Sequence, residues 1–326
     1  MLSRVADNLY WLSRYLERSE HTARLLDVNL DEVLDRNSAV ADQQLDLLVD
    51  SLRLQKSREA LLGTAVHEAR HPIRALPELL MLDAAQPHSI AYSIATAREN
   101  ARQVREQISS EMWLQINWLY QNIRTTTAER IWENSPHDFL QTLVKDGIHL
   151  FRGLTDATMN HGEGWQFIQL GCYMERAQAT AKVLDAHFRV NHTIERNGPY
   201  EQDLAWISLL KSCTAFEAYC KVYTVQIEPE RVAEFLLLNA DSPRSVRFAA
   251  DRILEAVRAI ATATGKQRGD PVTRLAGKLS ASLDYSSVDE ILDEGLHAYC
   301  VNIQNQCAKI HQAIYDRYIQ PKSVLS

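Results

Sequence analysis

The residues with the clearest chemical potential are two glutamate-arginine pairs, Glu17-Arg18 and Glu175-Arg176, which lie in two similar stretches of sequence. They are separated by 175 − 17 = 158 residues. A carboxylate beside a guanidinium can brace two helices, hold the carboxylate or phosphate of a ligand, or take part in proton transfer. At this offset eight residue pairs are identical: Leu12/Leu170, Tyr15/Tyr173, Glu17/Glu175, Arg18/Arg176, Thr22/Thr180, Ala23/Ala181, Leu26/Leu184 and Asp27/Asp185.

The repeat predicts two structurally equivalent helices, related by a pseudo-twofold axis. Small residues occupy the apolar seam within both motifs, namely Ser19, Ala23, Ala177 and Ala181. Small residues let two helix backbones approach closely, so we expect the two motifs to meet near the centre of the fold. The charges would then be cross-paired, Glu17 with Arg176 and Glu175 with Arg18, or would hold a ligand jointly.

The polar stripe beside the seam differs between the two copies. In the first copy it reads Tyr10, Arg14, Glu17, His21 and Arg24, and in the second Ile168, Cys172, Glu175, Ala179 and Lys182. Glu175 has apolar neighbours on its stripe, which predicts at least partial burial. A buried carboxylate must be paired, hydrogen-bonded or protonated. We therefore expect the loss of Glu175 to destabilise the protein more than the loss of Glu17.

Two histidine-containing patterns resemble metal sites but lack required parts. His67 and His71 flank Glu68 at the spacing of a zinc-protease helix, yet Pro72 disfavours helical geometry at His71 and no third ligand follows. Glu294 and His297 form one Glu-x-x-His pair, where a di-iron bundle needs two. We expect no metal and no cofactor.

Two arginine clusters are candidates for binding anions. Arg98 and Arg102 lie one turn apart on one predicted helical face, which is also typical of a solvated basic surface. Arg244 and Arg247 stand near the predicted start of another helix, capped by Asp241 or Ser242, where positive charge opposes the helix dipole. A bound anion or a neighbouring acid could compensate them.

Nucleophilic catalysis has no recognisable signature in this chain. The five cysteines form no Cys-x-x-Cys pair, and their spacing is typical of reduced thiols in a helical core. Neither a Gly-x-Ser-x-Gly elbow nor a phosphate-binding glycine loop is present.

The hydrophobic pattern predicts an all-α, multi-helix bundle. Apolar or small residues recur every seven positions from Leu2 to Leu30, which indicates a first helix of about nine turns. No alternation long enough for a sheet appears. Further helices are expected at about 41–62, 89–108, 110–120, from 136, 164–191, 201–224, 229–239, 243–263, within 271–285, and 288–319.

Bulk properties indicate one globular helical domain at 1–320 with a short tail at 321–326. Of the 326 residues, 46% are hydrophobic and 24% charged, and only 11 are Gly and 9 Pro. The formal net charge of −7 argues against a general nucleic-acid binder. Neither a membrane span nor a signal peptide is recognisable, which favours the cytoplasm. The oligomeric state does not follow from these features.

The segment 9–28, LYWLSRYLERSEHTARLLDV, resembles the opening of the bacterial alpha-E family, a helical domain of unknown function named for its Glu-Arg motif. Segments 97–102, 173–177 and 232–248 resemble later blocks of the same family in the same order. Cys172 and Ser19 depart from the family pattern. The resemblance covers nearly the whole chain. It implies partnership with a circularly permuted ATP-grasp protein and a transglutaminase-like protein, in a peptide-forming or peptide-tagging system. The resemblance identifies no catalytic residue in this chain.

Two functional interpretations therefore stand side by side. In the first, the chain is a non-catalytic helical partner or scaffold of an ATP-grasp ligase. In the second, it is an enzyme or ligand-binding subunit whose cleft takes an amino acid, a peptide carboxylate or an acyl-phosphate. That cleft would combine Glu17, Arg18, Glu175, Arg176, Arg98, Arg102, Arg244 and Arg247. Convergence of these residues on one open pocket would favour the second interpretation, and scattering or full pairing in the core would favour the first.

Overall fold

All regular structure in the described part of the chain is helical. The computed structural model describes residues 1–34, 38–54, 61, 72–193, 199–224, 226–267 and 269–320, and these ranges contain no strand. The predicted all-α fold is thereby confirmed. His67, His71 and the predicted tail lie outside the described residues. No described helix combines the length and the apolar character needed to cross a membrane.

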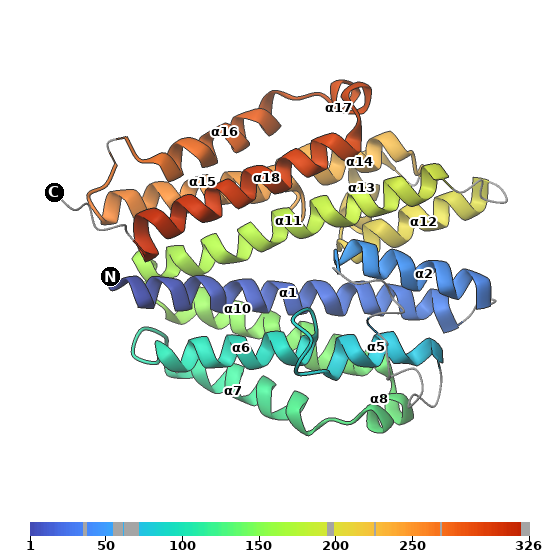
Figure 1. The fold of residues 1–326 in the computed structure, drawn as a ribbon, viewed down its shortest axis with the longest axis horizontal. Helices are drawn as coiled ribbons and strands as arrows, with labels where there is room; N and C mark the ends of the chain where they lie inside the picture. Colours follow the sequence, from blue (N-terminus) through green and yellow to red (C-terminus); the bar gives the residue numbers. More distant parts are fainter. Residues whose placement is uncertain are drawn as a thin grey trace.

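The two motif helices form the centre of the bundle. They are α1 (Ser3–Leu34) and α11 (Glu163–Thr193), the two longest helices of the described chain. They run side by side across the middle of the molecule in Figure 1 and make the most extensive helix–helix contact in the described structure. The predicted heptad seam of α1 is buried from Leu9 to Leu30, whereas its first member, Leu2, is exposed at the start of the chain.

Apart from α2 (Ser38–Ser51) and α12 (Pro199–Ser212), which contact both, each motif helix is covered by its own set of helices (Figure 1). α1 packs against α6 (Ile90–Gln103), which is followed by α7 (Ser110–Thr125) and α10 (Asp146–Thr158). α11 packs against α15 (Val246–Ala263) and α18 (Leu296–Ile314), with α16 (Pro271–Tyr285) outside them. The other elements are α5 (Pro72–Leu82), α8 (Ala128–Asn134), α9 (Pro136–Asp138), the π-helix η1 (Phe139–Lys145), α13 (Phe216–Tyr223), α14 (Pro229–Leu238), α17 (Val288–Glu294) and the π-helix η2 (Tyr315–Ile319).

Equivalent contacts occur at matched motif positions. The hydroxyl of Thr22 donates to the carbonyl of His88 just before α6, at 3.2 Å, and that of Thr180 donates to the carbonyl of Arg244 just before α15, at 3.0 Å. Likewise Asp27 contacts the Nδ1 atom of His137 at 2.6 Å. Its counterpart Asp185 contacts Nδ1 of His297, also at 2.6 Å. These matched contacts support the internal repeat and indicate that it includes the elements that pack against α1 and α11.

Three of the predicted helices are shortened or interrupted. The helix expected at 41–62 ends at Ser51, and Arg53 just beyond it has a φ of 50°. The helix expected at 201–224 is divided into α12 and α13 at Thr214, whose φ of 52° lies in the left-handed region. The helix expected at 288–319 is divided into α17 and α18 at Gly295, whose φ of 101° suits a residue without a Cβ.

The start of α15 differs from the expectation. Ser245 is the N-cap, and its hydroxyl accepts a first-turn backbone N–H at 3.0 Å. The expected caps, Asp241 and Ser242, instead donate their backbone N–H groups to the side chain of Asn239, at 3.0 and 2.7 Å, which holds them in a turn. Arg244 therefore precedes the helix and is free to reach across to α1.

The closest approach of α1 and α11 is at Gly171. The predicted small seam residues are buried as expected, but a Cβ at Gly171 would lie 2.2 Å from both the carbonyl oxygen of Tyr10 and the hydroxyl of Ser13. Real Cβ atoms do not approach a backbone oxygen so closely, so only glycine fits here. The sequence did not reveal Gly171, because the predicted small seam residues of α11, Ala177 and Ala181, lie further along the helix.

We predict that Gly171→Ala destabilises the protein by roughly 1–3 kcal/mol or more, because the added methyl forces the two central helices apart. Gly153 within α10 is the matched control, since a Cβ there meets nothing within 4 Å. Gly153→Ala should be stabilising by roughly 0.5–1 kcal/mol through helix propensity. Urea unfolding of both variants measures the difference. Equal stability of the two variants would contradict the close packing of α1 and α11.

Candidate functional site

The four motif charges are paired across the contact between α1 and α11. Arg176 donates two hydrogen bonds to Glu17, from Nε to Oε1 at 2.8 Å and from Nη2 to Oε2 at 2.9 Å. Reciprocally, Arg18 donates from Nε to Oε1 of Glu175 at 2.7 Å. Both carboxylates are buried. The predicted cross-pairing is confirmed, and each glutamate finds its partner on the other helix rather than on its own.

Glu17 belongs to a larger buried cluster, the Glu17 centre, made of Glu17, Glu20, Arg24, Arg152, Arg176 and Arg244. Arg152, from α10, contacts both carboxylates. Arg244 also bridges them, with its Nη1 atom 3.0 Å from Oε1 of Glu17. Arg24 donates from Nε to Glu20 at 2.8 Å, one turn away on α1. Arginines from α10, from α11 and from the turn before α15 thus converge on two carboxylates of α1.

Cys172 completes the lining of the Glu17 centre as a neutral donor. Its thiol lies 3.1 Å from Oε2 of Glu17. Burial, reinforced by the negative charge of Glu17, raises the pKa of Cys172 to about 11. The sulfur therefore stays protonated at neutral pH and donates a weak hydrogen bond, so it is not a ready nucleophile.

Glu175 lies in a second cluster, the Glu175 centre, made of Glu175, Arg14, Arg18, Lys182 and His311. Arg14 donates from Nε to Oε2 of Glu175 at 2.8 Å, and its guanidinium lies 4.7 Å from the ring centroid of Trp11. Burial lowers the pKa of Lys182, although Glu175 opposes this effect. Glu175 therefore pairs with cations from α1, which the apolar stripe predicted around it on α11 did not reveal.

Both motif carboxylates are ionised in the folded protein. Burial alone would raise the pKa of Glu17, but Arg152, Arg176 and Arg244 together bring it well below the usual value. For Glu175 burial is likewise outweighed, here by Arg14 and Arg18. The two glutamates therefore act as fixed negative charges, and neither is suited to give or take a proton near neutral pH.

Three of the candidate arginines do not join either centre. Arg98 donates to Asn117 at 3.0 Å on the face between α6 and α7. Arg102 is exposed and pairs with Glu99 at 2.7 Å. Arg247 contacts Asp284 on α16. Of the eight predicted residues the structure brings together Glu17, Arg18, Glu175, Arg176 and Arg244.

Sequence reasoning overlooked two residues of the Glu17 centre. Glu20 follows Glu17 by three positions, so helical spacing could have placed it on nearly the same face. Arg152 had no such signal, because its contact with Glu17 depends on how α10 packs against α1. The expected ranking of the two glutamates is also revised, since Glu17 is the more deeply buried and contacts three arginines where Glu175 contacts two.

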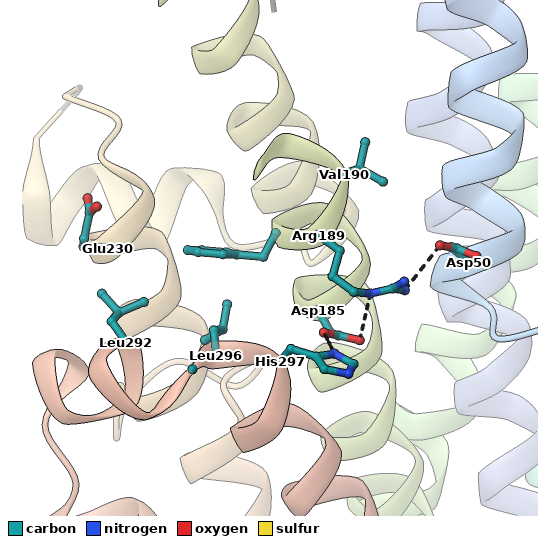
Figure 2. A pocket seen from close by; sticks show the side chains of 10 residues that line it. Asp50, Asp185, Arg189, Val190, Glu230, Leu292, Leu296 and His297 are labelled. Carbon is teal, nitrogen blue, oxygen red and sulfur yellow. Dashed lines mark hydrogen bonds and ion pairs between the residues drawn. The ribbon is translucent and has the colours of Figure 1, made fainter. Parts of the chain in front are cut away.

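Among the cavities of the described chain, one of about 620 Å³ lies where α1 and α11 begin, lined by Val5 and Glu163, and two others lie further along these helices. The first of these two, of about 280 Å³, opens beside the Glu17 centre between α1, α10 and α11 and is lined by Arg152, Arg176 and Cys172. The second, of about 820 Å³, lies near the far end of α11 (Figure 2). There the buried Asp185 pairs with His297 at 2.6 Å, beside the apolar Leu292 and Leu296. The described residues include no group of three or more side chains that could hold a metal ion.

The fold and the site define an all-α bundle built around two reciprocally paired Glu-Arg helices. This is the character of the Alpha-E family, described as a predicted alpha-helical domain with a conserved ER motif, which matches residues 1–319. The chain belongs to this family.

Known relatives are uncharacterised proteins from mycobacteria. One from Mycobacterium bovis and one from Mycobacterium tuberculosis are each 22% identical to this chain over 329 aligned positions. The alignments cover 96% of this chain but only 36% of each relative, so the chain spans about a third of the length of the proteins it matches. No solved structure matches the chain.

We predict that Glu17→Ala lowers the free energy of unfolding by about 3–5 kcal/mol, because it leaves buried arginines without their carboxylate. Glu99→Ala, which breaks the exposed pair with Arg102, should cost no more than about 1 kcal/mol. Glu175→Ala should fall between them. Denaturant titration of the three variants measures the order, and a Glu17→Ala protein as stable as Glu99→Ala would show that the pairing is not structural.

We also predict that stability falls as the pH drops from about 6.5 to 4. Burial lowers the pKa values of His21, His88 and His311 from 6.5 to about 4 in the folded chain. The unfolded chain takes up protons on these residues throughout that interval, whereas the folded chain does not, so acid favours unfolding.

His311→Phe should flatten this dependence while keeping a ring stacked on Tyr10. His161→Phe is the control, since His161 is exposed and stacks on Trp165. Unfolding curves at pH 4.5, 5.5 and 6.5 give the slope. An identical slope in wild type and His311→Phe would mean that His311 has the same pKa in the folded and the unfolded chain.

Proposed function

We propose that the chain is a cytoplasmic, non-catalytic helical subunit that docks with a circularly permuted ATP-grasp ligase in a peptide-forming or peptide-tagging system. A transglutaminase-like protein would be a further partner of the same system. Both partners come from the family resemblance, and the support from this chain lies in its interior, its surface and its relatives.

The interior favours a scaffold over a catalyst. The motif glutamates are held ionised by the arginines around them, which leaves them no role as acid or base. Burial raises the pKa values of Cys213 and Cys307 to about 12, so these thiols are as unreactive as Cys172. Because Arg98, Arg102 and Arg247 pair elsewhere, the eight-residue cleft of the enzyme interpretation lacks three of its members.

The observation that carries the proposal is an exposed apolar strip on α7 and α10, formed by Leu114, Trp118 and Leu150. These side chains are 65%, 48% and 53% exposed. The two helices are antiparallel, since Thr158 bonds to Ser109 at one end, while the ring of Trp118 faces Gly147 further along. This register brings Leu150 level with Leu114. Large apolar side chains grouped on one face typically mark a protein–protein interface.

The length of the relatives agrees with a docking role. In the mycobacterial proteins the region similar to this chain makes up 36% of the polypeptide, so most of each relative is other sequence. A domain that occurs within a longer chain works beside further domains. In this protein the corresponding association would use a surface such as the α7–α10 strip.

We predict that Trp118→Ala weakens binding to the ATP-grasp protein at least tenfold, because a partly buried tryptophan anchor is typically worth more than about 1.4 kcal/mol at an interface. Tyr285→Ala is the control. Tyr285 is an aromatic residue with 84% exposure on α16, on the other side of the bundle (Figure 1). Isothermal titration calorimetry with purified proteins gives both dissociation constants.

Three outcomes of this experiment would contradict the proposal. Wild-type chain that does not bind the ATP-grasp protein removes the partnership. Binding that depends on Tyr285 and not on Trp118 removes the α7–α10 strip as the docking surface. Release of phosphate from ATP by the purified chain alone, in the presence of amino acids, would show that the chain is itself an enzyme.

A further inference from the structure

The two motif centres contain more positive than negative charge. Among the described residues, the Glu17 centre has two carboxylates and four guanidinium groups, a surplus of 4 − 2 = 2 positive charges. The Glu175 centre adds Arg14, Arg18 and Lys182 against one carboxylate, a further surplus of 3 − 1 = 2. This concentration of positive charge lies inside a chain whose formal net charge is −7.

The neighbouring titratable groups do not remove the surplus. Cys172 is protonated and His21 is neutral, and Tyr173 has a pKa raised by burial. His149 contacts Glu20 and could only add positive charge. The one further acid at the 280 Å³ cavity is Asp156, which is exposed at its edge and faces His161.

Uncompensated buried charge is costly, and Arg244 shows its effect, whereas in Arg152 and Arg176 burial is outweighed by Glu17, which raises their pKa values. Removing charge from water costs several kcal/mol per ion unless a partner restores the interaction. Burial lowers the pKa of Arg244 below its ordinary value, and repulsion by Arg176 and Arg24 adds to this despite the contacts with Glu20 and Glu17. Such an arrangement is stable when an anion lies against it.

The 280 Å³ cavity is located where such an anion could bind. Its polar lining consists of Ser13, Arg152, Gln169, Cys172, Tyr173 and Arg176, together with the exposed Asp156 and with Thr155. Arg152 and Arg176 both line this cavity, and their guanidinium groups pair with Glu17. Its volume is at the small end of the usual range for ligand pockets, roughly 300–1,000 Å³, which suits a metabolite smaller than a nucleotide.

The internal repeat explains the cavity beside Glu17. At the offset of 158 residues, Cys172 occupies the position that matches Arg14. Arg14 is long enough to fill the space beside Glu175 and contacts it directly. Cys172 is short, so the equivalent space beside Glu17 remains open and is lined by arginine.

We propose that this cavity is a binding site for a small molecule carrying a phosphate group, held by Arg152 and Arg176. A phosphate monoester carries about −1.5 to −2 charges at pH 7, which matches the surplus of two at the Glu17 centre better than a single carboxylate does. Arginine also recognises phosphate by paired hydrogen bonds. Gln169, whose side-chain amide lines the cavity, supplies neutral donors. This inference goes beyond the docking role and does not depend on it.

The test measures the binding of defined anions to the full-length chain by isothermal titration calorimetry at low ionic strength, where screening is weak. The probes are inorganic phosphate, O-phosphoserine, serine and glutarate. Phosphate and phosphoserine should bind, serine should not, and glutarate should bind at least tenfold more weakly than phosphoserine. Tighter binding of phosphoserine than of phosphate would indicate that the organic part is also recognised.

Two variants examine the site itself. Arg152→Met should weaken phosphate binding at least tenfold, whereas Arg102→Met, at an exposed surface pair, should not change it.

Gln169→Glu is nearly isosteric and places a carboxylate at the cavity. It should weaken phosphate binding at least tenfold and raise the melting temperature of the ligand-free protein. Gln166→Glu, one turn earlier on α11 and outside the cavity lining, should leave phosphate binding unchanged.

Each contrary result has a definite meaning. No binding of phosphate or phosphoserine to the wild type would overturn the proposal and leave the arginines with a purely structural role. Phosphate binding that survives both Arg152→Met and Gln169→Glu would place the anion elsewhere, which also overturns it. Preference for glutarate over phosphoserine would exclude phosphate as the recognised group. Loss of partner binding in Trp118→Ala bears on none of these results.

Discussion

The structure depends on the reciprocal pairing of two glutamates and two arginines between α1 and α11. Glu17 and Arg176 form a two-bonded pair in the core, and Glu175 and Arg18 form its counterpart. Ions buried in a protein interior are tolerated only when their partners are held in place. The close contact of the two helices at Gly171 provides that placement. The remaining helices then cover two central helices whose relative position the charges have already fixed.

The two copies of the internal repeat have the same helical framework but different side chains around their motif glutamates. Matched threonine and aspartate residues make matched contacts in both halves, so the helical framework is used twice. Within that framework Arg14 corresponds to Cys172 and Glu20 to Gln178. These exchanges produce one centre with two carboxylates and an adjoining cavity, and another with one carboxylate whose surroundings are filled. A repeated fold can thus keep its architecture through one set of residues while a second set diverges.

A scaffold role and a ligand site are compatible in this chain because they use different parts of it. The α7–α10 strip lies on the outer surface, and the arginine-lined cavity lies beside the central pair of helices. α10 contributes to both, with Leu150 in the strip and Arg152 in the cavity. A bound anion would fix the position of Arg152 and so help to order the helix that carries part of the docking surface.

The amino-acid sequence by itself determined the helical fold, the two motif helices and the cross-pairing of their charges. Heptad periodicity, small seam residues and the repeat itself are local patterns, and they specify which face of each helix is buried. The convergence of Arg152 and Arg244 on Glu17 followed only from the tertiary structure, because these residues lie 135 and 227 positions away. The breaks at Thr214 and Gly295 were likewise hidden, since a single left-handed residue barely alters the hydrophobic pattern. Most of all, the surplus of positive charge became visible only when the side chains of three separate helices and one turn were brought together. Charge balance in a core is a property of the packed assembly, not of any one segment.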